Sequence, residues 1–136
     1  MKASRKKVLL VDDETFFCFS ASIALKKKGY HVTTAENGFK GLQALLAEDD
    51  SFDILVTDIL MPEKSGIELV DEVNRHGLKI PILVISGFMD EETKQILFEK
   101  GIADYLEKPF TPDDLLSRID RLLALDMDSL TQSTGR

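Results

Sequence analysis

Short apolar runs alternate along this chain with longer stretches in which apolar residues recur at helical spacing. The short runs predict five strands, at Lys7–Val11, His31–Thr34, Ile54–Thr57, Ile82–Ile85 and Ala103–Leu106. The first, third and fourth runs are continuously apolar rather than alternating, which is typical of strands buried on both faces of a parallel sheet.

The stretches between the strands predict helices. They cover Thr15–Lys28, Gly38–Ala47, Lys64–Arg75, Glu91–Lys100 and Pro112–Leu125. Asn37 and Thr111 stand at N-cap positions, and Gly29 and Gly101 follow helix ends. Because strand and helix alternate throughout, the pattern predicts an open, doubly wound α/β fold.

Right-handed crossovers between five strands predict a parallel sheet of order 2-1-3-4-5 with helices on both faces, the flavodoxin-like arrangement. The first and third strands are then neighbours at the switch point, where ligands bind at the carboxyl ends of the strands. Asp12 and Asp13 follow the first strand, and Asp58 follows the third. The acids therefore stand where the topology predicts a site.

Length and charge narrow the class of protein. The 136 residues fit a single domain at 7–125, with a basic N-terminal tail at 1–6 and a flexible C-terminal tail at 126–136. The formal net charge of −7 argues against direct nucleic-acid binding, which needs a basic surface. No segment approaches the roughly 20 apolar residues of a membrane span. The only cysteine, Cys18, has no partner for an internal disulfide, so we expect a reducing, cytoplasmic location and no membrane contact.

Clustered carboxylates favour a hard divalent cation, and Mg²⁺ is the cofactor we expect at Asp12, Asp13 and Asp58. A backbone carbonyl just past Asp58, that of Leu60, is a further ligand candidate. Asp58 ends an apolar run, and a carboxylate in that position is also a candidate nucleophile that forms an acyl phosphate. A metal ion would screen the repulsion between Asp58 and the incoming phosphoryl oxygens.

Two further polar residues end strands at the same edge of the predicted sheet. Ser86 ends the fourth strand, either to bind a phosphoryl oxygen or simply to form a local turn. Lys108 follows the fifth strand, either to pair with a phosphoryl group or as a solvated lysine. The Lys108–Pro109 bond is a candidate cis peptide.

These residues, taken together, resemble the response-regulator receiver domain of two-component signalling over about Lys7 to Leu125. The resemblance is carried by Asp12-Asp13, Asp58 with Met61-Pro62 and Gly66, Ser86-Gly87, and Tyr105 with Lys108-Pro109-Phe110. It implies that a sensor histidine kinase or a phosphotransfer protein phosphorylates Asp58. It also implies that Asp13 and Asp58 ligate Mg²⁺ with the help of Asp12.

The resemblance further implies how the signal is transmitted. Ser86 and Lys108 would bind the phosphoryl group, and Tyr105 would follow the Ser86 hydroxyl inward. The face made by the fourth helix, fifth strand and fifth helix would then change its affinity for a downstream effector, or drive a phosphorylation-dependent homodimer.

Two other functions remain open at this stage. One is a Mg²⁺-dependent phosphohydrolase with an aspartyl nucleophile, which normally needs a second aspartate where this chain has Leu60. The other is a phosphorylation-independent interaction module. The pattern also leaves open whether the chain is a stand-alone receiver or part of a longer regulator.

Apolar residues near the predicted site carry two hypotheses. Leu60 and Phe88 stand where receivers that lose phosphate quickly tend to carry polar groups, so we expect slow self-dephosphorylation. Of Phe16 and Phe17, we expect one to pack inward and one to lie near the surface as an anchor for the kinase, with a fully buried pair as the alternative.

Overall fold

A computed structural model describes residues 6–47, 51–59, 65–102 and 104–134. In this part of the chain, five parallel strands form one sheet of order β2-β1-β3-β4-β5, which confirms the predicted topology. The strands are β1 (Lys7–Val11), β2 (His31–Ala35), β3 (Ile54–Asp58), β4 (Ile82–Ser86) and β5 (Tyr105–Glu107).

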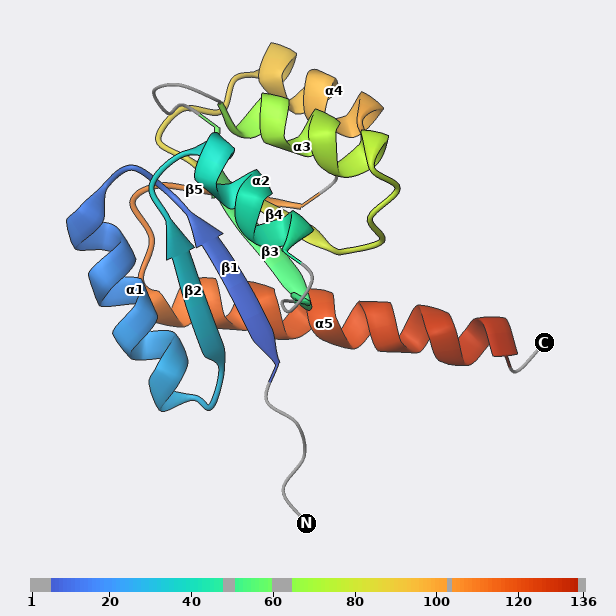
Figure 1. The fold of residues 1–136 in the computed structure, drawn as a ribbon, viewed down its shortest axis with the longest axis horizontal. Coiled ribbons are helices and arrows are strands. Elements are labelled where there is room, and N and C mark those ends of the chain that lie inside the picture. Colours follow the sequence, from blue (N-terminus) through green and yellow to red (C-terminus); the bar gives the residue numbers. More distant parts are fainter. Residues whose placement is uncertain (1–5, 48–50, 60–64, 103, 135–136) are drawn as a thin grey trace.

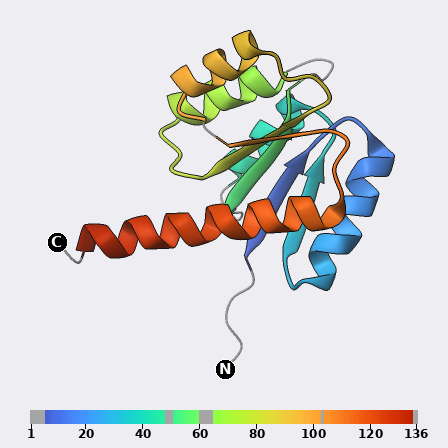
Figure 2. The same cartoon turned by 180° about the vertical axis from the view of Figure 1, so that it is seen from behind.

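Helices cover both faces of the sheet, as predicted. They are α1 (Thr15–Lys27), α2 (Gly38–Leu46), α3 (Gly66–Arg75), α4 (Glu91–Glu99) and α5 (Pro112–Thr134). Figure 1 shows α1 and α5 on one face and α2, α3 and α4 on the other, and Figure 2 shows the same layers from behind. The structure is therefore a three-layer α/β sandwich.

The apolar core lies in two layers, one on each side of the sheet. Every residue of β3 and β4 is buried, as the continuous apolar runs predict. Alternate residues of β1 point to opposite faces: Leu9 packs in the layer under α3, and Leu10 packs against α1 and α5. The parallel register of the central strands places their carboxyl ends, and the polar residues that follow them, at one edge of the sheet.

Local signals set most of the helix ends. The Asn37 side chain accepts a hydrogen bond from the backbone of Lys40, and the Thr111 hydroxyl accepts one from Asp114, so both predicted N-caps are confirmed. Gly29 and Gly101 adopt φ angles of 97° and 89° directly after α1 and α4, a conformation that glycine favours. These residues therefore fix where the helices begin and end between the strands.

The last helix is longer than predicted. The sequence analysis ends it at Leu125 and expects a flexible tail from residue 126, whereas α5 continues to Thr134. The segment after Leu125 contains no glycine or proline before Gly135, so no local signal stops the helix earlier. In Figure 1 this end of α5 projects well beyond the sheet. Among the described helices, none is long and apolar enough to cross a membrane.

Candidate functional site

Two carboxylates meet at the carboxyl ends of the central strands. β1 and β3 are paired with Val11 opposite Thr57, so Asp12 and Asp58 come next to each other at the same edge of the sheet. The Asp12 side chain is fully buried and that of Asp58 is only 9 % exposed. Acids buried this deeply need a charged or hydrogen-bonding partner.

Lys108, which lies 96 positions after Asp12 in the chain, supplies that partner. Its backbone N–H donates to the Ser86 carbonyl at 2.7 Å, which fixes the residue beside β4. The ammonium group donates to Oδ2 of Asp12 at 2.8 Å and to Oδ2 of Asp58 at 3.1 Å, and it also donates to Glu14. The peptide bond between Lys108 and Pro109 is cis, as predicted.

The cluster shifts the pKa values of its members. Burial raises the pKa of Asp12, and the hydrogen bond from Lys108 opposes that rise. For Lys108, burial by itself lowers the pKa, but the hydrogen bonds to Asp12, Glu14 and Asp58 outweigh it and leave the pKa raised. Lys108 therefore stays a cation at physiological pH and is a fixed positive charge beside Asp58.

The carboxylate oxygens of the cluster are suitable ligands for a hard cation. Oxygen atoms of Asp12, Glu14 and Asp58 all lie within 4.8 Å of one another, and carboxylate oxygens are the ligands that Mg²⁺ takes in proteins. Asp13 is exposed and is not in this group, so its assignment as a ligand stays a prediction. Leu60 lies outside the described residues.

Glu14 is the member that the sequence analysis missed. It directly follows the predicted acid pair, so the run Asp12-Asp13-Glu14 was the available signal. Sequence order alone does not say which acids of such a run turn toward the strand ends.

Ser86 ends β4 beside the cluster, with its side chain completely buried. Its hydroxyl donates to the carbonyl of Phe88 at 3.0 Å and accepts from the N–H of Phe88 at 3.2 Å. The local-turn interpretation therefore describes this structure, and a role in phosphoryl binding stays a prediction. The Phe88 side chain is 60 % exposed.

Tyr105, the predicted switch residue, is half-buried in β5 on the side of α4. Its carbonyl accepts a hydrogen bond from Arg118 of α5 at 2.7 Å, and the Lys94 ammonium lies 5.5 Å from its ring centroid. A groove of about 240 Å³ separates the tyrosine from α4, with Phe98 on its rim. Tyr105 thus contacts both helices of the predicted output face.

The aromatic pair on α1 divides as predicted. Phe17 packs edge-to-face on Phe110, with ring centroids 5.6 Å apart, and Lys108 lies 4.9 Å from the Phe17 centroid. Phe16 is 82 % exposed, so the fully buried alternative is wrong. Phe17 belongs to the wall of the site, whereas Phe16 faces outward.

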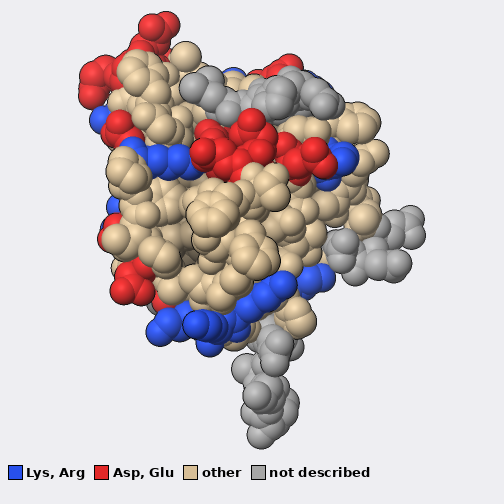
Figure 3. All heavy atoms as spheres, turned by 90° about the vertical axis from the view of Figure 1, so that its left-hand side faces the viewer, with Lys and Arg blue, Asp and Glu red and all other residues tan. Residues whose placement is uncertain are grey.

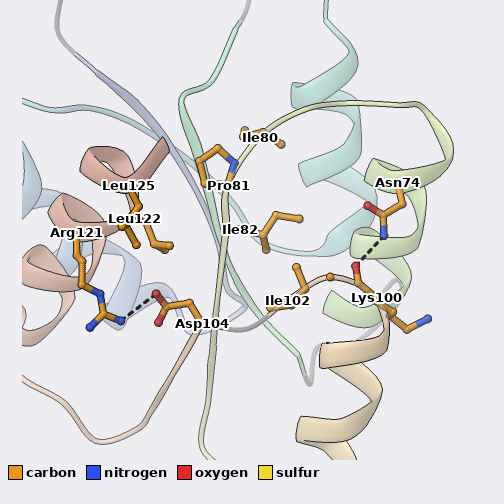
Figure 4. Close-up of a pocket in the computed structure, with 11 residues that line it drawn as sticks. Asn74, Ile80, Pro81, Ile82, Lys100, Ile102, Asp104, Arg121, Leu122 and Leu125 are labelled. Carbon is orange, nitrogen blue, oxygen red and sulfur yellow. Dashed lines mark hydrogen bonds and ion pairs between the residues drawn. The ribbon is translucent and has the colours of Figure 1, made fainter. Parts of the chain in front are cut away.

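A larger hollow lies away from the cluster, at the amino ends of β4 and β5. It has a volume of about 450 Å³, and Figure 4 shows Ile82, Ile102 and Leu122 along it with the Arg121–Asp104 ion pair at its edge. Of the predicted site residues that the structure describes, none lines it. The chemistry of this chain therefore concentrates at the opposite, carboxyl edge of the sheet.

The structure belongs to the class of doubly wound α/β domains, which bind their ligands at the switch point of the sheet. Carboxylates and a lysine gather at that point in this chain. The sequence profile of the response regulator receiver domain matches residues 8–120. The chain therefore belongs to the response regulator receiver domain family, whose role is in two-component signalling.

Individual relatives agree with this assignment. The chain is 34 % identical over 118 residues to the alkaline phosphatase synthesis transcriptional regulatory protein PhoP of Bacillus subtilis, with 87 % of this chain covered. It is 36 % identical over 116 residues to the response regulator SaeR of Staphylococcus aureus, covering 85 % of this chain. These matches cover 48 % and 50 % of the relatives, so the chain spans about half the length of the curated relatives it matches.

Solved structures show the same fold. A CheY-like receiver domain protein from Methanospirillum hungatei superposes with a TM-score of 0.86 at 28 % identity, covering 93 % of this chain and 99 % of that one. The chemotaxis protein CheY4 of Vibrio cholerae gives a TM-score of 0.81 at 32 % identity, covering 88 % and 99 %.

Proposed function

We propose that Asp58 is the phosphoacceptor of this receiver domain. A carboxylate oxygen of Asp58 attacks the phosphorus of a phosphohistidine on a sensor kinase or phosphotransfer protein. The new O–P bond makes an acyl phosphate, the N–P bond breaks, and the imidazole leaves with the electron pair and takes up a proton. The observation that carries this proposal is the 3.1 Å contact between Lys108 and Asp58 at the switch point. The product is the modified chain itself, so the domain acts as a switch rather than as a turnover enzyme.

The other residues of the site prepare Asp58 for this step. The Lys108 ammonium offsets the charge of the carboxylates and is placed to pair with the incoming phosphoryl oxygens. The Ser86 hydroxyl binds a phosphoryl oxygen once it leaves its local turn. Asp12 and Asp58, with Asp13 as the predicted partner and Glu14 within reach, are the residues that would hold Mg²⁺. When bound, Mg²⁺ supplies positive charge that screens the phosphoryl oxygens from these carboxylates.

The signal would leave the site through Tyr105. Withdrawal of the Ser86 hydroxyl toward the phosphoryl group frees space that the half-buried ring enters, and its contacts with α4 and α5 change. We propose that this shifts the affinity of the α4–β5–α5 face for a downstream effector or for a second copy of the domain. The groove beside Tyr105 supports this route, because the ring lines it together with Lys94 and Phe98 of α4, so a displaced ring changes the surface between β5 and α4.

The exposed side of α1 is the proposed docking surface for the phosphate donor. Phe16, Phe19 and Ile23 recur at helical spacing and are 82 %, 65 % and 44 % exposed. On the side of the molecule where α1 lies, Figure 3 shows an uncharged area below a group of acidic residues and above a band of basic residues. The end of α1 carries the basic run Lys26–Lys28. The apolar stripe begins at Phe16, two residues after Glu14 of the site, so a helical partner lying on it would bring its phosphohistidine close to Asp58.

Labelling of the chain tests the phosphoacceptor assignment. Incubation with acetyl phosphate and Mg²⁺, followed by mass spectrometry and mapping, should show one added phosphoryl group at Asp58. The label should disappear without Mg²⁺ and in Asp58→Asn, and it should persist in Asp113→Asn, a variant of an exposed acid on α5. Absence of labelling in the folded wild type would favour a phosphorylation-independent interaction module, and steady release of phosphate from an organic phosphate would favour the phosphohydrolase.

Nucleic-acid binding and cellular location both stay predictions. PhoP is named a transcriptional regulatory protein, and this chain spans about half of its length, so the absence of direct nucleic-acid binding stays a prediction for this chain. A cytoplasmic location remains the expectation for a domain that meets its kinase and effector in solution.

A further inference from the structure

Glu14 stands at the start of α1 without acting as a helix cap. It occupies the N-cap position, with φ and ψ of −83° and 98°, but its side chain makes no capping hydrogen bond. Ser, Thr, Asp and Asn are the residues favoured there, because a short side chain reaches the free N–H groups of the first turn. The Glu14 carboxylate instead accepts a hydrogen bond from Lys108, across 94 positions of the chain.

That contact uses the last donor of the lysine. An ammonium group has three N–H donors, and in this structure it donates to the three carboxylates of Asp12, Asp58 and Glu14. A phosphoryl group on Asp58 needs at least one of these donors. Phosphorylation converts the Asp58 carboxylate into an acyl phosphate, so its bond from Lys108 passes to the phosphoryl group. Further phosphoryl oxygens then compete with the two remaining carboxylates, those of Asp12 and Glu14, for the ammonium group.

The two remaining partners differ in how easily they can leave. The Asp12 side chain is fully buried, so an unpaired charge there would stay out of water. The Glu14 side chain is 60 % exposed and can turn to solvent. Glu14 is the partner that Lys108 gives up at the lowest cost.

We propose that Glu14 competes with the phosphoryl group for Lys108 and thereby sets how readily Asp58 is phosphorylated. This inference rests on the proposed phosphoacceptor role of Asp58. Before phosphorylation Glu14 holds the ammonium group in place, and on phosphorylation it is displaced into solvent. Glu14 is a positioning residue that acts through Lys108.

Binding of beryllium fluoride, a phosphoryl analogue, measures this competition at equilibrium. Each variant is titrated by calorimetry at saturating Mg²⁺, after a separate titration with Mg²⁺ alone. Glu14→Gln should bind the analogue about two- to fivefold more tightly than wild type, as loss of an ion pair with one exposed partner predicts. Glu14→Asp keeps the charge but shortens the side chain, so it should show most of the same gain. The gain should shrink at high salt.

Glu36→Gln is the matched control. Glu36 is an exposed acid directly after β2, at the same edge of the sheet, and its carboxylate pairs with Lys40 at 2.7 Å rather than with Lys108. Its removal should leave the affinity for the analogue as in wild type.

The outcomes separate the inference from the proposed function. If the wild type binds the analogue but neither Glu14 variant binds it more tightly, the competition is wrong and the phosphoacceptor role stands. A gain in Glu14→Gln that is absent in Glu14→Asp, or a gain of equal size in Glu36→Gln, would mean that net charge causes the effect. Either result would contradict the proposed competition between Glu14 and the phosphoryl group for Lys108. Weaker binding of Mg²⁺ alone to both Glu14 variants, with no gain for the analogue, would make Glu14 a metal ligand. Wild type that neither binds the analogue nor becomes labelled at Asp58 contradicts the proposed function itself.

Discussion

A Cβ atom at Gly66 would lie 2.0 Å from the carbonyl oxygen of Asp58. The first residue of α3 therefore packs directly on the backbone of the proposed phosphoacceptor. The N–H of Gly66 also donates to the Ile59 carbonyl at 2.9 Å, which ties the start of α3 to the end of β3. Because the close contact is with backbone, no change of rotamer can relieve it, and only glycine fits.

Gly66→Ala is thus expected to destabilise the domain by roughly 2 kcal/mol or more, within the range of strongly damaging single substitutions. Urea unfolding gives the free energy of unfolding for the variant and the wild type. Gly87→Ala is the matched control, because a Cβ at Gly87 meets nothing within 4 Å. Equal losses in the two variants would show that the Gly66 contact is not what limits this position.

Asp12→Asn should make the domain more stable at neutral pH. Burial raises the pKa of Asp12 in the folded chain above its ordinary value of 3.8. A raised pKa means that the stability contributed by protonated Asp12 is fully present below pH 3.8 and is lost as the pH rises through the folded-state pKa. At pH 7 the buried carboxylate is therefore a net cost, and we expect its neutral replacement to raise the free energy of unfolding.

The difference in the free energy of unfolding between Asp12→Asn and wild type should shrink as the pH falls through the raised folded-state pKa, where wild-type Asp12 takes up its proton. Urea unfolding at a series of pH values measures it. A variant that is less stable than wild type at pH 7 would mean that the hydrogen bond from Lys108 outweighs the cost of burial.

Phosphorylated Asp58 should be long-lived, because the two positions expected to orient water are apolar. The exposed Phe88 side chain offers no polar atom beside Ser86, and Leu60, which lies outside the described residues, offers none after Asp58. We expect Leu60→Asn and Phe88→Glu to shorten the half-life of the acyl phosphate by about tenfold or more. This change is smaller than the usual effect of a positioned general base, because these side chains would only orient the water. The loss of label after removal of acetyl phosphate gives the half-life. If the acyl phosphate of the wild type decays as fast as that of both variants, the prediction of slow self-dephosphorylation is wrong.

Phe16→Ala should impair transfer from a protein donor but not from a small molecule. An exposed aromatic anchor at an interface typically contributes more than 1 kcal/mol, so we expect about a tenfold loss in phosphotransfer from a histidine kinase that phosphorylates the wild type. Labelling by acetyl phosphate should be unchanged. Phe98→Ala, at an exposed aromatic on α4, is the control. Equal rates of phosphotransfer to the wild type and to Phe16→Ala would show that α1 is not the docking surface.

The amino-acid sequence by itself determined the order of the elements, the topology of the sheet and the edge that carries the site. Continuous apolar runs specify strands buried on both faces, and short, right-handed connections leave few arrangements for them. Once β1 and β3 are neighbours, Asp12 and Asp58 must follow them at the same edge. These inferences depend on local patterns and general rules of chain connection, which a single sequence contains.

The tertiary structure decided which side chains meet. Lys108 contacts Asp12 across 96 positions of the chain, and no local pattern specifies the length of that reach. In the run Asp12-Asp13-Glu14, the turn after β1 directs Asp12 and Glu14 to Lys108 and leaves Asp13 exposed, whereas the sequence ranked Asp13 above Glu14. The choice depends on backbone direction in a single turn and on a cation held by a distant strand, and both arise only when the whole sheet has assembled.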